Sequence, residues 1–383
     1  MKNKKIIMAG ALPYNAPTRI GIHHYASLFA KKKWDVFFLS AQLSPLHFIR
    51  GKDRIYSKEK LRLWIKGGEW YKNICSYSYM TILPILPFWA PSFIVKYSLK
   101  LSFPKLSRVI EKNEFGNADI LWIENPLHCE LPSLLRHKIL IYRIADEIEG
   151  FGENSPSILE KHENAVRNAN VIITTAKSLY EKYMQKNLKG KVLYIPNGVV
   201  FGNFNKNNLA LPEEYEHIPP PRVLYTGHVA SWFDQDLVIR CAENNKNLNF
   251  IIIGPATVDI SKMASIKNIY ILGSRKYADL PPYYTNANVG IIPFKINKLI
   301  ESVNPIKLYE YMAAGLPVVC TNWKEIKEMS TPAKLAANAD AFCHHIVSSL
   351  EVQNKTELVS FARQNSWENR FQRIMDEIEK DES

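Results

Sequence analysis

The segment SVNPIKLYEYMAAGLPVVC, residues 302–320, holds the clearest structural pattern in the chain. Asn304 is a residue type that caps helices, and Pro305 suits the first helical turn. The Gly-Leu-Pro sequence at 315–317 is typical of a helix end, and the apolar residues 317–320 predict a buried strand. The segment therefore predicts a helix followed at once by a strand, which is a unit of α/β folds.

Lys307 and Glu310 lie three residues apart on this predicted helix and therefore project from one face. A lysine near a helix start is suited to bind phosphate, and a glutamate accepts hydrogen bonds from sugar hydroxyls. The same spacing is also typical of a solvated ion pair on a helix surface. The two residues are candidates for a ligand site, with a surface pair as the alternative.

Short apolar runs and amphipathic stretches alternate along the rest of the chain, as they do in parallel α/β sheets. The order predicts an α/β fold with two Rossmann-like doubly wound domains that face each other across a cleft. Predicted strands lie at 5–9, 36–39, 120–123, 139–142, 171–174, 192–195, 223–226, 250–253, 269–272, 289–292 and 317–320. Predicted helices include 20–33, 235–244, 280–287, 305–314 and 367–380.

An Asn-rich stretch at 199–221, which ends in three prolines, separates the two series and predicts a linker. The first domain is therefore expected at 1–198 and the second at 199–366, followed by a terminal helix at 367–383. With 383 residues the chain is long enough for each domain to bury its own core.

The net charge of +12 is unevenly distributed. Residues 1–200 contain 30 basic and 16 acidic residues, whereas residues 201–383 contain 19 and 21. The excess is concentrated at 50–115, where 13 basic and five acidic residues mix with 12 aromatic ones, including Trp64 and Trp89. Such a mixture suits an anionic membrane surface, with a solvated helix face over a packed aromatic core as the alternative. Nucleic acid is not an expected partner, because no nucleic-acid-binding motif accompanies the segment.

Several classes of site are disfavoured by the sequence. It has neither a GxGxxG nor a P-loop pattern, which disfavours dinucleotide dehydrogenases and P-loop NTPases. The five cysteines are widely spaced, so we expect reduced thiols and neither a disulfide framework nor a zinc site. Three prolines interrupt the apolar stretch 79–95, so no transmembrane helix is expected, and no signal peptide either. Asp234 and Asp236 have the spacing of a metal-binding pair but suit a helix start better, so we expect metal independence and no cofactor.

The segment 302–320 closely resembles the donor-binding segment of GT-B-fold glycosyltransferases, which use a nucleotide-sugar. The resemblance covers nearly the whole chain. It implies that the terminal helix crosses back to the first domain. The WFD loop and the NPIK helix most resemble bacterial polysaccharide enzymes of the teichuronic-acid and xanthan-type glucuronosyltransferase kinds. The other matching stretches are IPNGV at 195–199, LYTGHVASWFD at 224–234, LGSRKYADLP at 272–281, GIIPF at 290–294 and NSWENR at 365–370.

The resemblance implies a donor site in the second domain. It implies that Lys307 holds the diphosphate and that Glu310 holds the ribose or the sugar. Many retaining enzymes of the fold have an acid eight positions before this glutamate, but Ser302 stands there and Glu301 is one place out of register, which favours inversion. The further implied contacts are Gly227 and His228 under the diphosphate, Arg275 and Tyr277 beside the base, and backbone groups of Ser302 and Val303 at the phosphates.

The first domain supplies the acidic candidates. Asp146 and Glu147 come just after the predicted strand 139–142, at the mouth of the cleft. An inverting transferase needs a carboxylate to take the proton of the acceptor hydroxyl. The position of Asp146 resembles that of the catalytic aspartate in the xanthan-type enzyme, which implies that it is the base, with a capping or solvated acidic cluster as the alternative. His23 and His24 are candidates on the acceptor side, with packing as the alternative.

The combined expectation is an enzyme, a hexosyl- or glucuronosyltransferase. It would move a sugar from a nucleoside-diphosphate sugar, UDP-linked, to a polyprenyl-linked glycan. We expect it in the cytoplasm, peripheral on the inner face of the cell membrane. The alternatives are a retaining transferase, a nucleotide-sugar epimerase or hydrolase, which would turn over the donor without an acceptor, and a non-catalytic membrane-associated nucleotide-binding protein.

Overall fold

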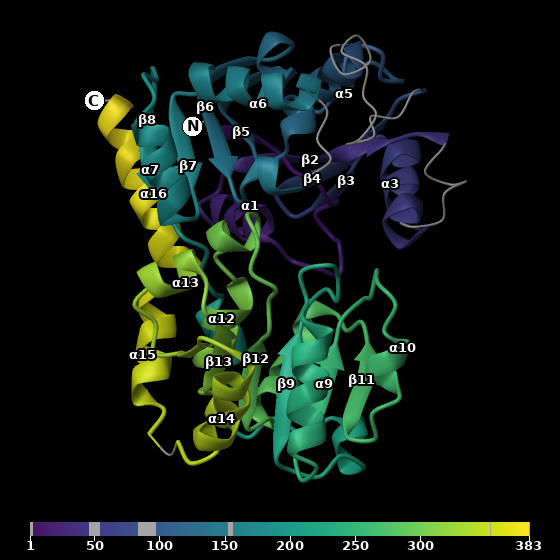
Figure 1. Ribbon diagram of the computed structural model, residues 1–383. Coiled ribbons are helices and arrows are strands. Elements are labelled where there is room, and N and C mark those ends of the chain that lie inside the picture. The colour runs from purple at the N-terminus through teal and green to yellow at the C-terminus, as the bar shows by residue number, and fades with distance from the viewer. Residues whose placement is uncertain (1–2, 46–53, 83–96, 152–155, 353, 383) are drawn as a thin grey trace. The chain divides into compact units, whose positions relative to one another are not determined.

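The computed structural model describes residues 3–45, 54–82, 97–151, 156–352 and 354–382. The chain divides into two compact units, Met1–Ile195 and Pro196–Ser383 (Figure 1). Each unit contains a mainly parallel sheet with helices packed against it, so the predicted α/β class is confirmed. No helix within the described ranges has the length and apolar character that crossing a membrane requires.

The first unit is built on an eight-stranded sheet in the order β3-β4-β2-β1-β5-β6-β7-β8. Its neighbouring strands pair in parallel, except that β3 and β4 are antiparallel. The strands are β1 Lys5–Ala9, β2 Asp35–Leu43, β3 Glu69–Tyr71, β4 Ile74–Met80, β5 Asn117–Ile123, β6 Arg136–Ile144, β7 Val171–Thr174 and β8 Lys191–Tyr194. The α-helices are α1 Gly21–Lys31, α3 Arg54–Lys66, α5 Leu106–Lys112, α6 Pro156–Asn168 and α7 Lys177–Met184.

Strand β1 lies in the middle of this sheet, and all of its residues are buried. Ile7 stands opposite Phe37 of β2 and Leu121 of β5. Strands that are buried on both faces are continuous apolar runs, which is why the sequence predicts them well. Strand β4 escaped prediction because its sequence, ICSYSYM, mixes serine with apolar residues. It is nevertheless buried, and Ser78 forms a hydrogen bond with Ser40 of β2.

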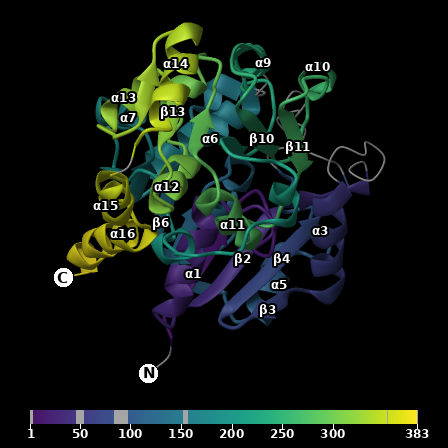
Figure 2. The same cartoon turned by 90° about the horizontal axis from the view of Figure 1, so that it is seen from below.

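The second unit has a six-stranded parallel sheet in the order β11-β10-β9-β12-β13-β14. Helices α9 and α14 pack next to each other in this unit (Figure 2). The strands are β9 Arg222–Thr226, β10 Asn249–Ile253, β11 Ile269–Gly273, β12 Val289–Ile292, β13 Val318–Thr321 and β14 Lys334–Ala336. The α-helices are α8 Phe201–Phe204, α9 Gln235–Asn244, α10 Ser261–Ala264, α11 Pro281–Thr285, α12 Ile306–Ala313, α13 Lys324–Glu328, α14 Ala339–Ser349, α15 Thr356–Gln364 and α16 Trp367–Glu382.

The stretch 199–221 is packed into the second unit, so the prediction of a linker there is wrong. It forms helix α8 and a 3-10 turn, and the side chains of Phe204 and Tyr215 are buried in the core. The guanidinium of Arg222, at the start of β9, donates to the carbonyls of Ile218 and Tyr215. Scattered aromatic residues anchor a stretch whose average composition is typical of a loop. The crossing of the terminal helix back to the first domain stays a prediction.

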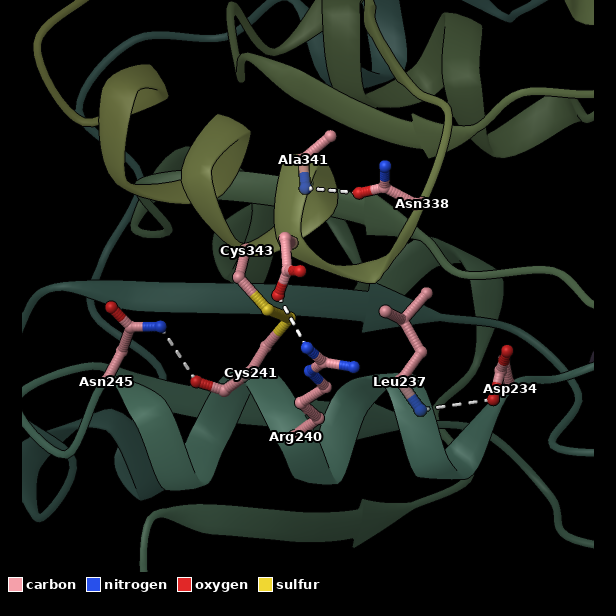
Figure 3. Close-up of a disulfide and its surroundings, with 9 residues drawn as sticks. Asp234, Leu237, Arg240, Cys241, Asn245, Asn338, Ala341 and Cys343 are labelled. Carbon is pink, nitrogen blue, oxygen red and sulfur yellow. Dashed lines mark hydrogen bonds and ion pairs between the residues drawn. A yellow bond between two sulfur atoms is a disulfide. The ribbon is translucent and has the colours of Figure 1, made fainter.

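The expectation of five reduced thiols is also wrong, because Cys241 of α9 and Cys343 of α14 form a disulfide (Figure 3). Their Cα atoms are 5.2 Å apart although 102 residues separate them in the sequence. An ion pair of 2.6 Å between Arg240 and Asp340 joins the same two helices. The spacing of the cysteines along the chain does not predict this disulfide, because the disulfide depends on the packing of α9 on α14. Cys75, Cys129 and Cys320 are free thiols.

Candidate functional site

A glycine loop follows β9 at the carboxyl edge of the second sheet. Gly227 has φ +138°, a backbone conformation that L side chains rarely adopt, and its N–H donates to the carbonyl of Ile253 over 2.8 Å. Gly254, which follows β10, approaches so closely that a Cβ there would lie 1.9 Å from the Gly227 oxygen. Both positions therefore require glycine, and the backbone segments after β9 and β10 pack closely at the strand ends.

Lys307 extends from helix α12 to this loop. A Cβ at Gly227 would lie 2.5 Å from the Lys307 ammonium nitrogen. That nitrogen lies 4.2 Å from the ring centroid of Tyr225 and 5.0 Å from that of Phe294. Among the described residues it has no hydrogen bond or ion pair within contact distance. Burial lowers the pKa of Lys307 to about 7, although Glu310 and Cys320 act in the opposite direction.

Glu310, one turn further along α12, is buried, with 5% of its surface exposed. The Tyr284 hydroxyl donates to its Oε2 over 3.3 Å. Burial raises the pKa of Glu310 to about 7, while hydrogen bonds from Tyr277 and Tyr284 and the charge of Lys307 lower it. Lys307 and Glu310 thus lie on one helix without forming an ion pair. The alternative of a solvated surface ion pair does not fit this arrangement.

The loop before α12 differs from the expectation. Asn304 was expected to cap the helix, but its side chain accepts from the Asn197 N–H and the Tyr309 hydroxyl instead. Pro305 itself is the N-cap residue. The Ser302 and Val303 N–H groups donate to Leu299 and Ile300 within a 3-10 turn. Both N–H groups are used within this turn, and the contact of Ser302 and Val303 backbone groups with the phosphates stays a prediction.

The other donor-side candidates lie around the same sheet edge. The guanidinium of Arg275 forms an ion pair with Glu214 and donates to the Tyr283 hydroxyl over 3.0 Å, which together restrict its position. Tyr277 is half-buried and lies beside Glu310, as its effect on that pKa shows. His228 follows Gly227; its carbonyl accepts from the Tyr225 hydroxyl over 2.9 Å, and its ring packs edge-on against Trp232.

In the first unit, Asp146 lies at the carboxyl edge of the sheet, just after β6. The neighbouring strand β5 ends one residue before Glu124, whose carboxylate forms an ion pair with Arg143 of β6. The side chains of Arg143 and Glu124 are only 1% and 8% exposed. Helix α1 begins at Gly21, where a Cβ would lie 2.7 Å from an Arg143 nitrogen. A buried cation is thus fixed within the same strand-end cluster as Asp146.

Asp146 is half-buried, and its carboxylate has no hydrogen-bond or ion-pair partner among the described residues. Burial raises the pKa of Asp146, while the Arg143 guanidinium lowers it. Burial likewise raises the pKa of Glu124, which the charge of Asp146 raises further against the effect of Arg143. An exposed edge on a carboxylate with a raised pKa suits a group that accepts a proton.

The three acceptor-side candidates are buried, and structural contacts hold His23 and Glu147. The buried ring of His23 accepts from the Ile20 N–H over 3.2 Å, so its other nitrogen donates to the Pro13 carbonyl over 3.0 Å. Burial lowers the pKa of His23 to about 4 and that of His24 to about 3, so both rings are neutral. Glu147 is also buried and forms an ion pair of 3.0 Å with Lys182.

The sequence interpretation missed Glu124 and Arg143. Glu124 follows the apolar run 120–123 just as Asp146 follows its own strand, so acids placed directly after predicted strands were the available signal. Asp234 caps α9 by accepting from the Leu237 N–H, as predicted. Within the described ranges, no three His, Cys, Asp or Glu residues are grouped as metal ligands would be.

Solved structures share this fold over nearly the whole chain. Sucrose-phosphate synthase from Thermosynechococcus elongatus superposes with a TM-score of 0.68 at 13% identity, covering 99% of both chains. Anabaena Alr3699/HepE in complex with UDP and glucose gives 0.68 at 14% identity, covering 99% of this chain and 100% of that one. At such identities the likeness shows the fold alone.

Two family models match the chain, one in each unit. The model "Glucuronosyltransferase GumK, N-terminal domain" matches residues 8–175, and "Glycosyl transferases group 1" matches residues 220–351. The chain is a glycosyltransferase with the GT-B fold. The family and the GT-B fold that the sequence resemblance implied are thereby confirmed.

A curated relative agrees with this activity. The glycosyltransferase TuaH of Bacillus subtilis (strain 168), assigned to teichuronic acid biosynthesis, is 26% identical over 254 residues. The match covers 62% of this GT-B chain and 64% of the relative, so it spans less than two thirds of the relative's length.

Proposed function

We propose that this chain transfers a sugar from a UDP-sugar to a polyprenyl-linked glycan in cell-surface polysaccharide synthesis, with inversion at the anomeric carbon. The observation that carries the proposal is Lys307, whose ammonium lies beside the Gly227 loop with no counter-ion in contact within the described part of the chain. A desolvated cation of this kind is stabilised by an anionic ligand. Support also comes from HepE, which was solved with UDP and with UDP-glucose, and from the name of TuaH.

On the donor side, Lys307 binds the diphosphate above Gly227 and His228. The loop brings no side chain between the strand end and the ligand, because Gly227 and Gly254 have none. Glu310 accepts hydrogen bonds from hydroxyl groups of the donor, with Arg275 and Tyr277 beside the base. The ammonium of Lys307 also stabilises the negative charge that develops on the departing UDP, so the proposed reaction uses no bound metal.

On the acceptor side, Asp146 is the general base. Its carboxylate takes the proton of the acceptor hydroxyl while the hydroxyl oxygen forms a bond to the anomeric carbon. The bond between that carbon and the UDP oxygen breaks, and UDP leaves with the electron pair. Burial raises the pKa of Asp146, and the charge of Arg143 acts against this shift and favours the ionised form. Single displacement by this route inverts the anomeric configuration.

The docking surface is the described part of residues 50–115; residues 50–53 and 83–96, with Trp89, lie outside the described residues. Six of the ten exposed large hydrophobic residues in the described ranges lie here: Ile65, Trp70, Ile82, Tyr97, Leu101 and Phe103. Exposed Lys66, Lys72 and Lys100 lie between them in the sequence, and exposed Lys105 follows Phe103. Apolar side chains beside lysines suit an anionic headgroup layer, which would keep the enzyme in the cytoplasm at the inner membrane face.

A thermal-shift screen of nucleoside-diphosphate sugars tests the donor site, since a ligand that binds only the folded chain raises its Tm. We expect UDP-sugars to raise the Tm and Lys307→Met to remove the shift. No shift with any nucleotide would refute the central proposal.

Sedimentation with vesicles tests the docking surface. Anionic vesicles should bind the chain and neutral vesicles should not, and Ile65→Ser/Phe103→Ser should lower the fraction that sediments with the vesicles.

A turnover assay with polyprenyl-linked acceptors then tests the base. Asp146→Asn should abolish transfer and leave the UDP-induced Tm shift near normal, whereas retained transfer would exclude Asp146. Glu147→Gln is the matched control, because Glu147 is the adjacent acid but is paired with Lys182. UDP release without any acceptor would favour a hydrolase or an epimerase, and UDP binding without turnover on any acceptor would favour a binding protein.

A further inference from the structure

A chain of four buried hydrogen bonds ends at Glu310. The Thr226 N–H lies 2.7 Å from the Tyr311 hydroxyl, which lies 3.1 Å from the Thr226 hydroxyl. The Thr226 hydroxyl lies 2.7 Å from the Tyr284 hydroxyl, which is 3.3 Å from Glu310 Oε2. All four residues are buried.

The direction of each bond in this chain follows from chemistry. The Glu310 carboxylate can only accept and each hydroxyl has one proton, so the directions are fixed from the Glu310 end, and the Thr226 oxygen accepts the Tyr311 proton. The Thr226 proton then goes to Tyr284, and the Tyr284 proton goes to Glu310. Every proton therefore points toward the carboxylate, and Glu310 is the final acceptor.

We propose that Thr226, Tyr284 and Tyr311 are positioning residues, which orient the Glu310 carboxylate as an acceptor for the ribose hydroxyls of the donor. This inference rests on the proposed function, because it requires a nucleotide at this site. A carboxylate accepts about four hydrogen bonds, so the bond from Tyr284 restrains the Oε2 atom and leaves acceptor capacity for a ligand.

The three hydroxyl residues come from different elements. Thr226 ends β9, Tyr284 lies on α11, and Tyr311 lies on α12 with Glu310. The Tyr311 ring fills the space beside Gly290 of β12, where a Cβ would lie 2.7 Å from it. The chain thus ties the end of the sheet to both helices, and the carboxylate is held against rotation in a site that disfavours its charge.

The test compares the binding of UDP with that of its 2′,3′-dideoxyribose analogue by calorimetry. The intact chain should bind UDP more tightly by about tenfold or more, since a lost hydrogen bond to a charged group has an effect of that order. Tyr284→Phe should weaken UDP binding by a similar factor and leave binding of the analogue unaffected. The discrimination, meaning the ratio of the two affinities, should then disappear. Thr226→Val, which removes a middle link at nearly constant volume, should reduce it as well.

Two further variants separate positioning from general packing. Glu310→Gln should also remove the discrimination, and combining it with Tyr284→Phe should add nothing, because both act through one carboxylate. Tyr309→Phe is the matched control: Tyr309 is buried on the same helix, but its hydroxyl donates to Asn304 over 3.0 Å. It should leave the discrimination unchanged.

The outcomes distinguish this inference from the proposed function. If the intact chain binds neither nucleotide, the donor site itself is refuted and the inference falls with it. If it binds both equally, or if Tyr284→Phe weakens both by one factor, the nucleotide site stands and the positioning role is refuted. Loss of discrimination in Tyr284→Phe and Thr226→Val, with Tyr309→Phe unchanged, supports it.

Discussion

Each unit holds a cation near a carboxyl group at the carboxyl edge of its sheet, but the two arrangements differ. In the first unit, Arg143 forms a buried ion pair with Glu124. In the second, Lys307 contacts aromatic rings, and no ion pair to it exists among the described residues. An arginine stays charged at any relevant pH, whereas a desolvated lysine is held near its titration point. The first centre therefore keeps its charge inside the protein, and the second leaves its charge for a ligand.

The two cations share one structural device. A glycine lies against each of them, Gly21 against Arg143 and Gly227 against Lys307, and a Cβ at either would be less than 3 Å from a side-chain nitrogen. Both glycines thus contact a cationic side chain, but their backbone conformations differ, because only Gly227 has a positive φ. The comparison can be tested by removing each cation, each supporting contact and each glycine.

The largest expected effect is on stability. Arg143→Met leaves Glu124 buried without its partner, so we expect a loss of about 3–5 kcal/mol in the free energy of unfolding, measured with urea. Adding Glu124→Leu should restore much of it. Lys307→Met should change stability by less than about 1 kcal/mol, since no ion pair is broken. Equal losses in the two variants would contradict the comparison.

The second unit should depend on a covalent contact where the first depends on an ion pair. Cys241→Ala/Cys343→Ala removes the link between α9 and α14, and we expect a loss of about 2–4 kcal/mol. A reducing agent should lower the Tm of the intact chain and leave that of the double variant unchanged. Cys320→Ala, which alters a free buried thiol, controls for packing. A Tm insensitive to reduction would show that the bond contributes nothing to stability.

The glycines should differ in which property they protect. Gly21→Ala crowds Arg143, and overpacking of this kind lowers stability by about 1–3 kcal/mol. Gly227→Ala strains the backbone and displaces Lys307, so UDP binding should fall by about tenfold or more. Denaturation and calorimetry on both variants measure the two effects. The assignment fails if Gly227→Ala binds UDP normally.

The smallest expected effect is the uptake or release of protons when the nucleotide binds. Free Lys307, with a pKa of about 7, is mostly neutral at pH 8, so binding a diphosphate there should take up protons, up to about one per site. Glu310, with a pKa of about 7, is mostly protonated at pH 6, so binding as an acceptor should release protons there. Calorimetry in buffers of different ionisation enthalpy measures both. Lys307→Met should abolish the uptake at pH 8, while Arg143 contributes nothing to it.

Sequence reasoning reached the donor helix more fully than its surroundings. Lys307 and Glu310 were found because both lie on one short helix with recognisable start and end residues. Asp146 was proposed because it follows a buried apolar strand and resembles the catalytic aspartate of the xanthan-type enzyme, and its role stays a prediction. Glu124, which follows another such strand, was missed because its partner Arg143 is 19 residues away on β6. The hydrogen bonds of the Ser302 and Val303 N–H groups within their turn could not be predicted, because they depend on the exact backbone path.

By itself the sequence determined the alternating order of strands and helices, the two-unit division of charge and the GT-B family, because these depend on local periodicity, composition and short motifs. The tertiary structure alone decided the Cys241–Cys343 disulfide, the Glu124–Arg143 ion pair and the hydroxyl chain to Glu310. Thr226 and Tyr311 are 85 residues apart, and the two cysteines 102. Contacts of that kind arise only when the strands and helices pack, and no pattern along the chain encodes which side chains then meet.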